Sequence, residues 1–178
     1  MTGVSIEHDY FGVVDSTSSG GLYWDDTLEV GDQFVELVLT ADDEDLVSQA
    51  SLDLAAAMAQ GLEAFDGRAR EALVAQLSER QSATTTFIDR QVDSRGEDLQ
   101  TLLDLMVDNS GDIAIDVLKS LQLLRVAIHP EAAQSGISSG DDAFATFDYA
   151  IDPDESDELL IVSFGADGDV IDVEDVPE

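Results

Sequence analysis

Hydrophobic and polar residues alternate along the first third of the chain. Four runs there are of strand type: 5–8, 11–15, 22–30 and 33–40. Gly31-Asp32 separates the two longer runs and predicts a hairpin, because glycine supplies the positive φ of a type II′ turn. Val35, Leu37 and Leu39 would then share one face of the second strand, and that face would be buried.

The period changes to a helical one in the middle of the chain. The acidic residues 42–45 precede Leu46 and predict a helix N-terminus, because acids are favourable there. Apolar positions then recur at helical spacing as far as Gly61, which we expect to end this helix. Asp66 is expected to cap a second helix, with Arg68, Arg70 and Arg80 pointing outward.

Two further helices are expected after a segment that the pattern does not define. Residues 81–98 are polar and threonine-rich, and both a helix and a loop are compatible with them. Leu99, Leu102, Leu103 and Met106 form the apolar face of a third helix. Asp112 is expected to cap a fourth.

Strand patterns return in the last third, at 123–128, 145–151, 159–164 and 170–173, with a loop at 135–140. We therefore predict one α+β domain over residues 1–178, with strands at 1–40, helices at 44–122 and strands at 123–175. Segregated strands and helices favour a mostly antiparallel sheet with the helices packed on one face.

Acidic residues dominate the composition. The 178 residues include 40 acids and 7 bases, for a formal net charge of -33, and they contain no cysteine. All seven bases lie between Arg68 and Arg125, so residues 1–67 and 141–178 carry only acids. Aspartate outnumbers glutamate and lysine occurs once, a bias that fits either a salt-adapted source or a high-GC bacterium. A solvated surface is the simplest interpretation of this charge.

Several classes of protein are disfavoured by this composition. Seven bases do not suffice for a nucleic-acid-binding face. No apolar stretch approaches the ~20 residues of a membrane span, and no secretory signal is visible. A cytoplasmic location is the expectation that remains. Phosphate-binding loops, a nucleophile elbow and dinucleotide fingerprints are missing, so we expect no cofactor.

Three stretches carry a resemblance to a known family. They are Phe11-Gly12 with Trp24 downstream, FDGRAREAL at 65–73, and TFDYAIDPDESDELLIVSFGADGDVIDVE at 146–174. Together they resemble a bacterial family catalogued as domain of unknown function two-thousand-four. The resemblance implies an α+β module without established catalytic residues. Some members lie near toxin and immunity genes, which favours an immunity-like role.

His8 and His129 are the candidate metal ligands. Each stands at the end of an expected strand, and imidazole nitrogens with a carboxylate can bind a divalent cation if they converge. Ordinary edge histidines are the simpler interpretation. The acidic stretches 152–158 and 167–174 lack the glycine and glutamate positions of a calcium loop, so we interpret them as solvated turns. Trp24 is expected to fill the core.

These observations predict a non-enzymatic binding module that engages a basic protein. An enzyme with a carboxylate or histidine site is the first alternative, and an acidic mimic of nucleic acid is the second. A pocket holding a histidine would favour the enzyme, an exposed acidic face would favour binding, and elongated rows of carboxylates would favour mimicry. The pattern does not define the oligomeric state.

Overall fold

The computed structural model describes residues 5–31, 33–108, 110–133 and 143–177. Its strands form one eight-stranded sheet whose spatial order follows the chain. The strands are β1 (Ile6–His8), β2 (Gly12–Ser16), β3 (Leu22–Val30), β4 (Gln33–Ala41), β5 (Gln122–Ile128), β6 (Ala145–Ala150), β7 (Leu159–Phe164) and β8 (Val170–Val176). The expected strands are confirmed, and so is the α+β class.

Strands β4 and β5 join the two ends of the chain into this sheet. They pair in parallel, with Leu37 opposite Val126, whereas the other pairs of neighbouring strands in the described chain are antiparallel. The β3–β4 hairpin has the expected position, and Gly31 has a φ of +60°. The strands of the two acidic ends of the sequence therefore lie in a single layer.

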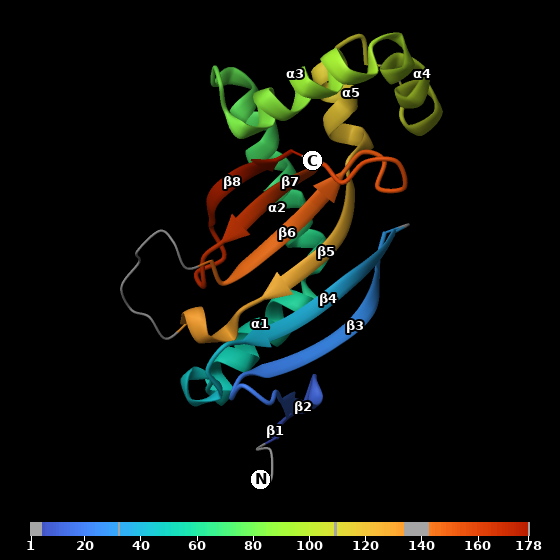
Figure 1. The fold of residues 1–178 in the computed structure, drawn as a ribbon. Helices are drawn as coiled ribbons and strands as arrows, with labels where there is room; N and C mark the ends of the chain where they lie inside the picture. Colours follow the sequence, from blue (N-terminus) through green and yellow to red (C-terminus); the bar gives the residue numbers. More distant parts are fainter. Residues whose placement is uncertain (1–4, 32, 109, 134–142, 178) are drawn as a thin grey trace.

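The helices occupy the sequence between β4 and β5, and Figure 1 shows α1 and α2 behind the sheet and α3 to α5 grouped at one end of it. Their bounds are α1 (Gln49–Gln60), α2 (Leu62–Ala75), α3 (Ala83–Arg95), α4 (Glu97–Met106) and α5 (Ile113–Ser120). Short 3₁₀ turns occur at η1 (Glu44–Leu46), η2 (Gln76–Ser78) and η3 (Pro130–Ala133). No described helix is both long and apolar enough to cross a bilayer.

The core lies between the sheet and the helices. Val35, Leu37 and Leu39 are fully buried on the face that the alternation predicted. Trp24 is half-buried and packs its ring edge-on against Phe11, with 4.8 Å between the ring centroids, so it contributes to the margin of the core. Gly61 ends α1 and Asp112 caps α5, both as expected.

Two expected helix starts are wrong. The acids at 42–45 lead only into η1, and α1 begins after Ser48, whose hydroxyl accepts a hydrogen bond from the Ser51 N–H in a capping box. Asp66 caps nothing, because α2 begins at Leu62 and places Asp66 in its second turn. Its carboxylate instead accepts hydrogen bonds from Arg70, which is therefore turned inward, and from Tyr149.

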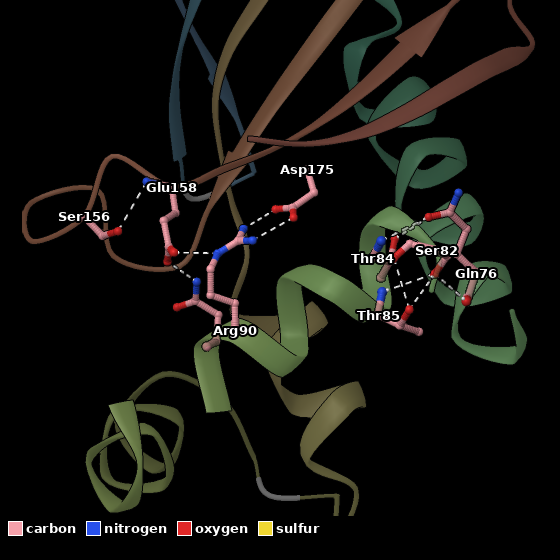
Figure 2. Close-up of polar contacts among 9 residues, drawn as sticks. Gln76, Ser82, Thr84, Thr85, Arg90, Ser156, Glu158 and Asp175 are labelled. Carbon is pink, nitrogen blue, oxygen red and sulfur yellow. Dashed lines mark hydrogen bonds and ion pairs between the residues drawn. The ribbon is translucent and has the colours of Figure 1, made fainter. Parts of the chain in front are cut away.

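The undefined segment 81–98 is mostly helix α3. Ser82 caps it by accepting a hydrogen bond from the Thr85 N–H, and Gln81 precedes it with a φ of +61°. Its buried face contains Thr84, which donates to the Gln76 side chain at 2.7 Å (Figure 2). It also contains Gln91, which donates to Glu158. Burial of these two polar side chains costs little, because each of them has a hydrogen-bond partner. The expected loop at 135–140 lies outside the described residues.

Candidate functional site

The side of the sheet that faces away from α1 and α2 is the first candidate; we call it the open face. Cross-strand partners point to the same side of a sheet, so the register assigns its residues. Its carboxylates are Glu7, Asp15, Asp25, Glu29, Glu36, Asp148, Asp172 and Glu174. Apart from the half-buried Asp148 they are exposed, so this layer presents negative charge to solvent.

Arg125 is the one base among the described residues of the open face. Glu36 of β4 and Asp148 of β6 are its cross-strand partners on either side, so it sits between two carboxylates. Burial raises the pKa of the Asp148 carboxyl, and the positive charge of Arg125 opposes that rise. The centre of the face therefore holds a half-buried carboxyl, Asp148, whose charged form is stabilised by Arg125.

Apolar side chains share the open face with these charges. Phe34 is 75% exposed at the hairpin end, and Tyr23 is 45% exposed with its hydroxyl donating to Asp25 at 3.3 Å. Val38 of β4, the cross-strand partner of Asp25, belongs to the same face but is only 1% exposed. An exposed aromatic beside carboxylates can pack on the aliphatic stem of a lysine or arginine.

The remaining six bases lie in the helical segment or the turn between η2 and α3, and several are engaged in internal contacts. Arg68 donates to the Gly168 carbonyl oxygen at 3.1 Å, and Arg70 donates to Asp66 at 3.1 Å. Arg90 lies between Glu158 and Asp175 and donates to both carboxylates (Figure 2). Arg68 and Arg90 thus connect helices to the segments around β7 and β8, whereas Arg70 pairs within α2, and none of the three neutralises the open face.

His8 forms part of the second candidate site, a cleft of about 370 Å³ between β1 and α1. The His8 side chain is 6% exposed, and its Nε2 lies 2.8 Å from Oδ1 of Asp53, an exposed residue of α1. Asp9, Tyr10 and Gln60 also line the cleft. A histidine–aspartate pair in a concave site is the arrangement that the enzymatic alternative requires.

Both ring nitrogens of His8 are occupied, however. The Tyr10 backbone N–H donates to Nδ1 at 3.1 Å, so the neutral ring carries its proton on Nε2 and donates it to Asp53. A general base needs a free nitrogen lone pair within reach of the substrate. This imidazole has none unless one of its hydrogen bonds breaks.

His129 lies elsewhere in the sheet. It follows β5, with strands β2, β3 and β4 between it and β1. Its Nδ1 is 3.1 Å from the Thr40 hydroxyl, and its backbone N–H donates to the Phe144 carbonyl oxygen. The structure therefore does not bring the two candidate ligands together. Among the described residues, no group of three or more histidine and acidic side chains is placed to hold a metal ion.

The two acidic stretches near the C-terminus are partly structural. Glu158 accepts hydrogen bonds from Arg90 and Gln91, and Asp167 accepts one from the Asp169 N–H in the turn before β8. Asp53 and Tyr10 are neighbours of His8 that the sequence pattern does not indicate. Asp53 is 45 residues away and has the spacing of an ordinary solvent-facing helix position, so nothing in the sequence identifies it.

Comparison with known proteins adds no relative. No protein-family model, curated protein or solved structure matches this chain. The resemblance to the family of unknown function therefore stays a prediction.

Proposed function

We propose that this chain is a non-enzymatic binding module whose open face engages a basic surface of a partner protein. The observation that carries the proposal is the distribution of charge. The open face holds carboxylates from both ends of the chain around the single Arg125, while the other bases lie outside this face. Complementary charge raises the association rate and the specificity of such a complex.

The exposed aromatic residues favour a protein partner over non-specific binding of small cations from solution. Phe34 and Tyr23 offer apolar area next to Asp25 and Glu36, and arginine is enriched where it can both stack and pair. An immunity-like role, in which the acidic face blocks a basic toxin, is the specific form of this proposal. The second alternative, mimicry of nucleic acid, is weaker because Arg125 and apolar residues interrupt the carboxylates.

The enzymatic alternative rests on the His8–Asp53 cleft. A His8→Asn variant tests it, because asparagine keeps polar atoms at this position and removes the imidazole. If His8 only attaches β1 to α1, this variant loses stability and keeps every binding activity. A hydrolytic or transfer activity that disappears in the folded variant would favour the enzyme.

Two variants with the same charge change test the binding module. One neutralises open-face acids by Asp25→Asn, Glu36→Gln and Asp172→Asn, and the other neutralises helix-layer acids by Glu63→Gln, Glu71→Gln and Asp89→Asn. Wild type and both variants are used to capture proteins from a lysate at 0.05 and 0.3 M NaCl, and the dissociation constant of each purified partner is then measured. Only the open-face variant should lose a basic partner, and the wild-type complex should weaken with salt.

Equal loss in both variants would mean that net charge alone attracts the partner, and it would contradict a specific face. A complex that is insensitive to salt would also contradict the proposal. Duplex DNA serves as a negative control, and we expect no binding to it.

A further inference from the structure

A groove between α2 and α5 has mostly apolar walls. It has a volume of about 330 Å³ and is lined by Leu73, Val74, Ile115 and Leu118 together with Arg70 and Lys119. Leu73 and Leu118 form a buried floor, whereas Val74 is 48% exposed at the side. Apolar walls with a few polar groups are typical of ligand sites, and this volume lies at the small end of their range.

The two bases at this groove have different roles. Arg70 donates to Asp66 and to the Leu121 carbonyl oxygen at 3.0 Å, and its guanidinium lies over the Tyr149 ring. Its hydrogen bonds therefore hold α2 against the segment that follows α5. Lys119 is exposed and has no acidic partner within 4.0 Å among the described residues.

An unpaired lysine is unexpected in this chain. It is the single lysine, and 40 acids are available to pair with it. Instead its exposed ammonium lies at a groove whose other lining residues are mostly apolar, so it adds a positive charge beside an apolar surface. The combination suits a ligand with an aliphatic tail and one negative head group.

We propose that the groove binds a medium-chain carboxylate, with its aliphatic tail on Leu73, Val74 and Leu118 and its carboxylate at the Lys119 ammonium. The site is separate from the open face and does not depend on the proposed partner. The net negative charge of the protein opposes an anion from a distance, but at 0.15 M salt this opposition is screened beyond ~8 Å, whereas the contact with Lys119 is direct.

Binding of octanoate, octanol and octyltrimethylammonium tests the proposal. The three probes share a tail and differ in the head group. Titrations at 0.15 M NaCl and pH 7.5 follow the methyl NMR signals of Leu73, Val74, Ile115 and Leu118. We expect octanoate to shift these signals and to bind about fivefold more tightly than octanol, as an ion pair at a partly exposed site allows.

Variants separate the head group from the tail. Lys119→Gln should remove the preference for octanoate and leave octanol binding intact, whereas Arg80→Gln, an exposed base outside the groove, should change neither. Val74→Trp should fill the groove and abolish binding of both probes, with Val92→Trp on α3 as the matched control. Each variant is first checked by its melting temperature.

Equal affinity for octanoate and octanol in the wild type would overturn the proposal, as would a preference for the ammonium probe or a carboxylate preference that survives in Lys119→Gln. Shifts confined to residues outside the groove would also overturn it. None of these results bears on the open face, whose test uses other variants.

Discussion

The phenol of Tyr149 on β6 donates a 2.6 Å hydrogen bond to Oδ1 of Asp66 on α2, across 83 residues of sequence. Arg70 approaches the same carboxylate one helical turn later and lies over the Tyr149 ring. A tyrosine, an aspartate and an arginine thus attach α2 to the centre of the sheet. Because Tyr149 is fully buried, its hydroxyl would have no access to water if this bond broke.

Replacing Tyr149 with phenylalanine tests this attachment. The variant keeps the ring and removes the hydroxyl, so Asp66 loses one donor in a half-buried site. We expect the free energy of unfolding to fall by roughly 1–3 kcal/mol in urea denaturation. Tyr23→Phe, which removes an exposed hydroxyl that also binds a carboxylate, should change it by less than about 0.5 kcal/mol. Similar losses in both variants would contradict the assignment.

The pKa of Tyr149 predicts a loss of stability in alkali. Burial first, and then the charge of Asp66, raise the pKa of Tyr149 above its ordinary value of 10.0. The unfolded chain therefore releases this proton at a lower pH than the folded chain does. The stability that Tyr149 contributes is complete below pH 10 and is lost as the pH rises further, by up to about 1.4 kcal/mol per pH unit.

Urea denaturation of wild type and Tyr149→Phe over a pH series measures that loss. The free energy of unfolding should fall more steeply above pH 10 in the wild type than in the variant. Parallel curves would show that other groups cause the alkaline loss.

Among substitutions in the helical segment, we expect replacement of Arg90 to lower the free energy of unfolding the most. It neutralises Glu158 and Asp175, whose side chains are only 13% and 11% exposed. Arg90→Ala leaves both carboxylates without their cation, so we expect a loss of roughly 3 kcal/mol, measured by urea denaturation. Arg80→Ala should cost less than about 0.5 kcal/mol. If the two losses are equal, the contact at Arg90 contributes no more than a surface charge.

The half-buried Asp148 predicts a stabilising substitution. Because burial raises the pKa of its carboxyl, the charged form is unfavourable in the folded state. Asp148→Asn should raise the melting temperature at pH 7, and the gain should disappear near pH 3, where the wild-type carboxyl is protonated. Asp25→Asn on the same face removes the same charge from an exposed position, so it should give a smaller gain.

Salt should stabilise the whole protein. A net charge of -33 repels itself within the folded state, and the screening length falls from ~30 Å at 0.01 M to ~3 Å at 1 M salt. If screening contributes about 2 kcal/mol, the melting temperature rises by roughly 4–8 °C over that range. A melting temperature that is flat or falls with sodium chloride would contradict this expectation.

The sequence predicted the strands well because their buried positions are apolar at every second residue. It did not define α3 because two of its buried positions are Thr84 and Gln91, whose partners Gln76 and Glu158 come from other elements. A pattern of apolar residues cannot reveal a polar group that is buried with a partner. The start of α2 was misplaced for a similar reason, since Asp66 has tertiary partners and resembles a cap in the sequence.

The candidate sites were predictable only in part. The acidic ends were visible in the sequence, but their union in one layer depends on the β4–β5 pairing, which alternation does not specify. His8 stood out as a rare residue, whereas Asp53 did not, because acids are common throughout this chain. Nothing in the sequence indicated the α2–α5 groove, because Leu73 and Leu118 have the spacing of ordinary core positions.

The parallel pairing of β4 with β5 has a consequence for how the chain folds. Leu37 and Val126 are adjacent in space, but the whole helical segment separates them along the chain. Closing so long a loop costs entropy before the contact repays it, and such distant contacts slow folding. While the protein is being synthesised, β4 is an open edge until β5 has emerged from the ribosome. The acids of the N-terminal hairpin then protect nascent chains from pairing with one another.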